Sequence, residues 1–219
     1  NLGYLFNEIN NHESARLYLE KAISINPNYA EAYNNLGNSL TKLTRFDAAI
    51  DAFKKAIELR QDYTKAMNNL GNVFKDKGKL TEAINQYKNA LRIDPKFVEV
   101  FSNLGVALKD QGNYDAAIEN FEKAISLDPK FAKAMNNIGN AYMDIGKIDE
   151  ALTNYKKAIE IDPNFAEAYH NLSKVVKFSS YSSYIDKMCE VYKSGKLVDR
   201  DKYHICFALG KAYGDIGEY

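Results

Sequence analysis

Asparagine side chains are the groups in this sequence whose spacing points most clearly to chemistry. The longest series has one asparagine every 34 residues, at Asn1, Asn35, Asn69, Asn103, Asn137 and Asn171. Two shorter series keep the same step, at Asn34, Asn68 and Asn136 and at Asn38, Asn72 and Asn140. A carboxamide carries both donor and acceptor, so it matches the C=O and N–H of a peptide unit. A row of them predicts a surface that holds an extended polypeptide by its backbone.

Other residue types that often carry catalysis or bind metals are few and scattered. The three histidines, His12, His170 and His204, show no metal-ligand spacing, and no Gly-rich phosphate loop is present. Cys189 and Cys206 lie on apolar stripes, so we expect core packing of free thiols in a reducing compartment, which favours the cytoplasm. The sequence therefore predicts a protein that is not an enzyme, with no catalytic residue, no metal site and no cofactor.

Charge and hydropathy narrow the class of partner. The 219 residues carry 29 Lys and Arg against 29 Asp and Glu, which gives a formal net charge of zero. A nucleic-acid surface needs an excess of basic side chains on phosphates, and no basic run supplies one. The apolar runs are far shorter than the ~20 residues that cross a bilayer. We therefore expect a protein or extended peptide as partner, with no nucleic acid and no membrane insertion.

The step of 34 residues extends to the residues that shape the backbone. Pro95, Pro129 and Pro163 keep it, and so do two longer series. The glycines of the first series are Gly3, Gly37, Gly71, Gly105 and Gly139, and the alanines of the second are Ala22, Ala56, Ala90, Ala124 and Ala158. Self-similarity with this period indicates stacked supersecondary units.

One unit, residues 98–131, shows what each repeat contains. Apolar residues recur with helical spacing over its first part, at Phe101, Leu104 and Leu108, and again over its second part. Gln111-Gly112-Asn113 separates the two stretches, and Asp128-Pro129 follows the second. A glycine followed by turn residues ends a helix, and proline stops one. Each unit is therefore predicted to be a pair of helices, and the fold to be all-α.

The repeated pattern resembles the tetratricopeptide repeat (TPR). It reads Tyr, Met or Phe, then Leu or Ile followed by Gly, then Ala with an aromatic four residues later, then Asp-Pro. The resemblance implies a right-handed superhelix of antiparallel helix pairs, with a single TPR solenoid over residues 1–219. We expect a partial repeat 1–29, complete repeats 30–63, 64–97, 98–131 and 132–165, an irregular repeat 166–202 and a partial repeat 203–219. We also expect the chain to be a fragment of a longer protein.

In the TPR fold, the first helix of each repeat lines the concave surface. The resemblance therefore implies that the asparagines form a peptide-binding groove, similar to the asparagine row of the O-GlcNAc transferase TPR superhelix. The eleven predicted binding residues are Asn34, Asn35, Asn38, Asn68, Asn69, Asn72, Asn103, Asn136, Asn137, Asn140 and Asn171. The alternative is that these amides only bond to a neighbouring helix, and the sequence leaves that alternative open.

Two other functions compete with a scaffold that binds extended peptides. The segment from Cys206 to Tyr213 resembles the junction in bacterial TPR proteins that carry a C-terminal sulfotransferase domain. The chain would then be the substrate-recruiting arm of a transferase, either a sulfotransferase or a glycosyltransferase, whose catalytic domain lies outside residues 1–219. The third hypothesis is end-to-end self-association through truncated repeats.

Overall fold

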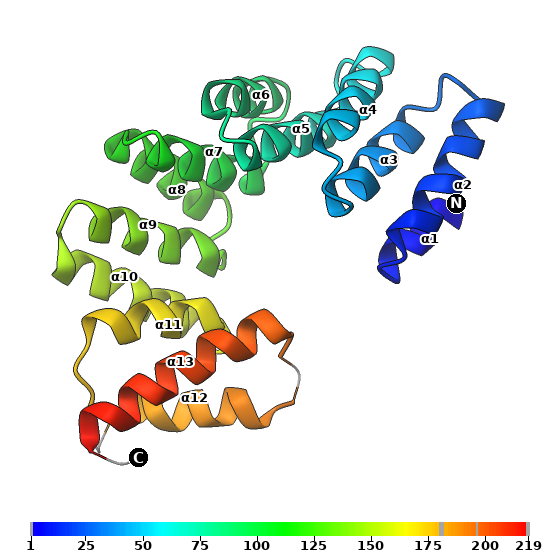
Figure 1. Cartoon of the computed structure of the whole chain (residues 1–219). Helices are drawn as coiled ribbons and strands as arrows, with labels where there is room; N and C mark the ends of the chain where they lie inside the picture. Colours follow the sequence, from blue (N-terminus) through cyan, green and yellow to red (C-terminus); the bar gives the residue numbers. More distant parts are fainter. Residues whose placement is uncertain (1, 180–181, 196, 218–219) are drawn as a thin grey trace. The chain divides into compact units, whose positions relative to one another are not determined.

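The computed structural model describes residues 2–179, 182–195 and 197–217, and within these residues all regular structure is helical (Figure 1). This confirms the all-α prediction. The helices are α1 Leu2–Glu8, α2 His12–Ile25, α3 Ala30–Lys42, α4 Phe46–Leu59, α5 Thr64–Asp76, α6 Leu80–Ile93, α7 Val98–Asp110, α8 Tyr114–Leu127, α9 Ala132–Asp144, α10 Ile148–Ile161, α11 Ala166–Val175, α12 Ser183–Lys193 and α13 Asp199–Ile216.

The helix boundaries follow the sequence period. The helices α3, α5, α7, α9 and α11 begin at Ala30, Thr64, Val98, Ala132 and Ala166, which are the first residues of the expected repeats. The turn inside each pair has its penultimate residue at positive φ, namely Gly78, Gly112 and Gly146 in three of the pairs. Thr44 takes the same conformation with φ 58°. Glycine adopts it without steric cost, whereas a side chain with a Cβ pays for it.

The conserved step of the glycines has a packing reason in the structure. Gly37, Gly71 and Gly139 lie in first helices, and each faces an aromatic ring from the second helix of its own pair. The rings belong to Phe53, Tyr87 and Tyr155, all buried to within 2% of full burial. The absence of a Cβ on the glycine lets the ring lie directly against the first helix, and this close packing fixes the geometry of each pair.

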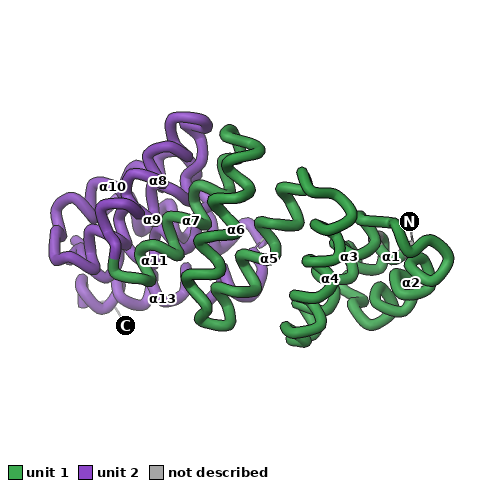
Figure 2. Tube along the Cα trace, turned by 90° about the horizontal axis from the view of Figure 1, so that it is seen from above, with its two compact units in different colours: residues 1–112 green, residues 113–219 purple. Residues whose placement is uncertain are grey.

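Two compact units make up the chain, residues 1–112 and 113–219 (Figure 2). Unit 1 contains α1 to α7 and unit 2 contains α8 to α13. Within unit 1, α3 packs on α4 and α5 on α6, and each pair packs on the next pair along the chain. Within unit 2, α9 packs on α10 and α10 on α11. The assignment of one solenoid to residues 1–219 stays a prediction.

The last three helices depart from the regular repeat. The helix α11 is shortened to Ala166–Val175, and α13 packs against both α11 and α12. The expected apolar stripe of α12 is confirmed at Ile185 and Met188 but not at Tyr192, which is half exposed. Asp199 was expected to cap the last helix, but it is the first helical residue, because the chain is already extended at Val198.

Candidate functional site

The predicted binding asparagines lie on the first helices of the repeats. Because α3, α5, α7 and α9 have the same length of 13 residues and begin 34 residues apart, equivalent asparagines take equivalent places on each helix. Asn1 lies outside the described residues. The structure therefore groups the amides by position, as the sequence predicts, and the next question is what each amide contacts.

Amides of successive first helices bond directly to one another. Asn69 Nδ2 donates to Asn34 Oδ1 at 3.0 Å, and Asn103 Nδ2 donates to Asn68 Oδ1 at 2.9 Å. In unit 2, Asn171 Nδ2 donates to an oxygen of the preceding repeat at 3.0 Å, that of Asn136. The partners lie 35 residues apart, so each bond joins one repeat to the next. This is the contact that the architectural alternative requires.

A second set of amides bonds to the tyrosines that face the glycines. Tyr87 Oη donates to Asn72 Oδ1 at 2.7 Å, and Tyr155 Oη donates to Asn140 Oδ1 at 2.9 Å. Burial, together with nearby carboxylates, raises the pKa of both phenols above their usual range, so each phenol stays protonated and donates. Asn140 Oδ1 also accepts from Asn171 at 3.1 Å. The sequence analysis missed the phenols as partners, although their 34-residue step is visible.

Exposure divides the eleven predicted residues into two groups. Four are at most 8% exposed, so a ligand does not reach them without local rearrangement: Asn34, Asn136, Asn137 and Asn171. Seven are partly exposed: Asn35, Asn38, Asn68, Asn69, Asn72, Asn103 and Asn140. The prediction treated all eleven as facing a groove, because the period of a helix gives the face of a residue but not the depth to which the next helix covers it.

Comparisons with known proteins identify the repeat. A family described as "TPR repeat" matches residues 3–43, 71–112, 107–146 and 139–177, and one described as "Tetratricopeptide repeat" matches residues 30–63. The first of these covers well over half of the chain. The chain belongs to the tetratricopeptide repeat family. No curated protein matches it.

Several solved TPR structures resemble the chain. The crystal structure of MamA is 28% identical with a TM-score of 0.66, over 74% of this chain and 95% of that one. YrrB, described as "a TPR protein with an unusual peptide-binding site", is 26% identical with a TM-score of 0.58, over 87% and 96% of the two chains. Pseudomonas aeruginosa PilF, at 19% identity and a TM-score of 0.71 over 94% and 92%, shares the fold.

The TPR chain carries an aromatic cluster that the sequence analysis did not predict. The rings of His170 on α11 and His204 on α13 have centroids 4.9 Å apart, and Tyr203 and Phe207 lie within 6.0 Å of His170. His170 is only 8% exposed, and its Nδ1 has no hydrogen-bond partner in the described part of the chain. Neither ring nitrogen of His204 has one there either. Packing of α13 on α11 creates this contact.

The buried histidine makes the TPR chain sensitive to acid. Burial, with smaller contributions from Lys174 on the same helix and His204 on α13, lowers the pKa of His170 from 6.5 to about 4. The unfolded chain therefore binds the proton more readily, so this stabilisation is complete above pH 6.5 and is lost as the pH falls towards 4. We expect a loss of about 1–2 kcal/mol in unfolding free energy between pH 7 and pH 5.

Urea unfolding of the TPR chain at both pH values measures this loss. His170→Asn restores the amide that other repeats carry at the equivalent position, as at Asn34, and removes the titrating group. The variant should therefore lose clearly less stability than the parent chain over the same pH interval. Equal losses in the two proteins would show that His170 is not the responsible group.

The two cysteines differ from the prediction of core packing. Cys206 is exposed, because α13 buries Ile205, Ala208 and Ala212 and leaves Cys206 on another face. Cys189 is partly buried, with its Sγ 3.4 Å from Tyr213 Oη. Among the described residues of the TPR chain, no group of three or more His, Cys, Asp or Glu side chains could hold a metal ion. None of its described helices has the length and apolar character needed to span a bilayer.

Proposed function

We propose that this TPR chain is a non-catalytic scaffold that binds an extended polypeptide segment through the partly exposed amides of its first helices. The family supports the coarser part of the proposal, since TPR repeats serve as protein-interaction scaffolds. The matching families describe repeats and no catalytic domain. A cytoplasmic location and end-to-end self-association remain predictions from the sequence.

The observation that carries the proposal is the hydrogen-bonding capacity left over in unit 1. Asn69 and Asn103 each use an N–H to reach the preceding repeat, and their Oδ1 atoms accept no hydrogen bond within the described residues. The side chain of Asn38 makes no hydrogen bond there at all. These three amides lie on successive first helices α3, α5 and α7 and are partly exposed. They offer acceptors, and in Asn38 also donors, to a peptide backbone.

The inter-repeat bonds also support the proposal through preorganisation. An amide held by a neighbouring repeat loses little side-chain freedom when a ligand binds, which reduces the entropic cost of association. The likeness to YrrB, whose title names a peptide-binding site, points to the same class of ligand. Since each hydrogen bond contributes a net ~0.5–1.5 kcal/mol, a few amides give weak, micromolar binding at best.

The test needs a variant that changes binding without changing stability, and Asn38→Ala meets that need. Peptides selected from a random-sequence array on the parent chain would be labelled, and their Kd values measured by fluorescence polarisation. We expect Asn38→Ala to weaken all selected peptides by a similar factor of about 2–10, corresponding to one lost hydrogen bond. Because amides are neutral, the affinities should vary little with salt.

Two control variants separate binding from architecture. Asn69→Ala removes the bond to Asn34, so it should lower the free energy of unfolding by about 1 kcal/mol as well as weaken binding. Asn85→Ala deletes an exposed amide on the second helix α6 and should change neither quantity. If every selected peptide binds Asn38→Ala as tightly as the parent chain, the amides of unit 1 are architectural and the proposal is wrong.

A further inference from the structure

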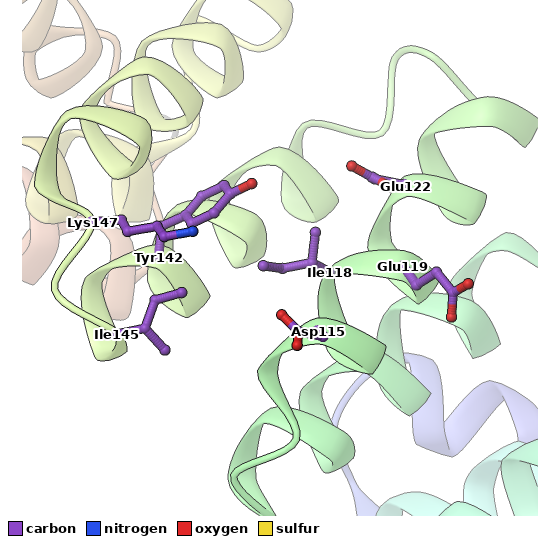
Figure 3. Close-up of a pocket in the computed structure, with 7 residues that line it drawn as sticks. All are labelled: Asp115, Ile118, Glu119, Glu122, Tyr142, Ile145 and Lys147. Carbon is purple, nitrogen blue, oxygen red and sulfur yellow. The ribbon is translucent and has the colours of Figure 1, made fainter.

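A groove in unit 2 lies between α8 and the end of α9, on helices that carry none of the free amides discussed above (Figure 3). Ile118 forms one wall, and Tyr142 and Ile145 form the other. Ile145 is 37% exposed, which leaves an apolar side chain open to water. The cavity of about 200 Å³ is smaller than the ~300–1,000 Å³ of small-molecule sites, so it fits side chains of a polypeptide better.

The rim of this α8–α9 groove is acidic. Asp115, Glu119 and Glu122 come from α8, and Lys147 is the one basic residue of the lining. None of the three carboxylates has a hydrogen bond or ion pair within the described residues. Figure 3 shows Asp115 beside Ile118, while Glu119 directs its carboxylate away from Tyr142. Three negative charges against one positive charge leave the lining with a net charge of −2.

The equivalent positions of the other second helices show that these charges are not a property of the repeat. The three positions carry Glu13, Leu17 and Glu20 on α2, Asp47, Asp51 and Lys54 on α4, Thr81, Asn85 and Lys88 on α6, and Asp149, Thr153 and Lys156 on α10. Only α8, among these five helices, has an acidic residue at all three positions. Like charges three or four residues apart destabilise a helix by ~0.2–0.5 kcal/mol per pair, so folding alone does not account for this arrangement.

The groove of α2 shows how the same surface is neutralised elsewhere in the chain. There Arg16 takes the place of Ile118 and bonds to Glu13 at 2.9 Å and to Glu20 at 2.8 Å. Arg45, in the place of Lys147, bonds to Glu13 at 2.6 Å. In the α8–α9 groove an isoleucine replaces the central arginine. This exchange removes the internal cation and provides an apolar contact in its place.

We propose that the α8–α9 groove docks a basic amphipathic segment of a partner protein. A Lys or Arg of the partner supplies the missing cation near Asp115 and Glu122, and an apolar side chain next to it covers Ile118 and Tyr142. Such an arrangement, an apolar centre within a charged rim, is how protein interfaces combine burial with electrostatic selection. The surface is separate from the free amides of unit 1, so it would bind a partner independently of them.

A short fluorescein-labelled peptide of Arg, Leu and Ala serves as the probe, measured by fluorescence polarisation on the full chain. We expect Asp115→Asn combined with Glu122→Gln to weaken its binding by at least about fivefold. Binding should fall steeply with added salt, because rim charges are screened. Probes with Glu in place of Arg, or with Ser in place of Leu, should bind much more weakly.

Control variants decide whether the effect belongs to this groove. Asp149→Asn combined with Glu160→Gln removes two exposed carboxylates from α10, one of them equivalent to Asp115, and should leave probe binding unchanged. Asn38→Ala should also leave it unchanged. The proposal is overturned if the α10 double variant weakens binding as much as the α8 double variant does, or if the α8 double variant has no effect. Loss of probe binding in Asn38→Ala alone would place the probe on the amides of unit 1 and would also overturn it.

Discussion

Tyr155→Ala is expected to lower the free energy of unfolding by about 3–5 kcal/mol, the range for removing a large aromatic side chain from a core. The ring is only 2% exposed and lies against Gly139, where a neighbouring side chain cannot move in to fill the space. The substitution also removes the donor from Tyr155 Oη to Asn140. Urea unfolding of the purified variant at neutral pH measures the loss.

Two control variants separate the contributions of the ring and the hydroxyl group. Tyr155→Phe keeps the ring and removes only the hydrogen bond, so it should cost about 0.5–1.5 kcal/mol. Asn140 Oδ1 still accepts from Asn171 in that variant, which keeps the cost at the lower end. Tyr192→Ala removes a half-exposed ring and should cost less than about 0.5 kcal/mol. A loss in Tyr155→Ala no larger than in Tyr155→Phe would contradict the packing argument.

The regular part of the fold was readable from the sequence because its causes are local and repeated. Helical spacing, the turn glycines and the Asp-Pro stops act within a few residues, and the repetition confirms each assignment several times. The helix starts at Thr64, Val98 and Ala132 therefore coincide with the expected repeat boundaries. The same reasoning places the asparagines on the first helices.

The depth and the partners of the amides could not be read in this way. Whether an asparagine is free depends on how closely the next repeat approaches, and the sequence pattern is the same for Asn103, which is partly exposed, and Asn137, which is buried. The contact between His170 and His204 depends on the packing of α13 against α11, after a segment in which the period fails. Tertiary packing decides both features, and it has no local signature in the sequence.

Replacement of two helical glycines by alanine should change stability in opposite directions. Alanine is the better helix former by about 1 kcal/mol, so the substitution is favourable wherever there is room for a methyl group. At Gly210 a Cβ would meet no atom within 4 Å, and Gly210→Ala should raise the free energy of unfolding by up to about 1 kcal/mol. The sequence places Gly210 in the motif order of the repeat, but no second helix covers it within the described residues.

At Gly71 the same methyl group has no room. A Cβ there would lie 2.5 Å from Cε1 of Tyr87, a ring with no exposed surface whose Oη is held by Asn72. Overpacking costs about 1–3 kcal/mol, which exceeds the gain in helix propensity, so Gly71→Ala should destabilise the chain by about 1–2 kcal/mol. Urea unfolding of both variants gives the comparison. If both substitutions stabilise the chain, the ring can move, and close packing is not the reason for glycine at this position.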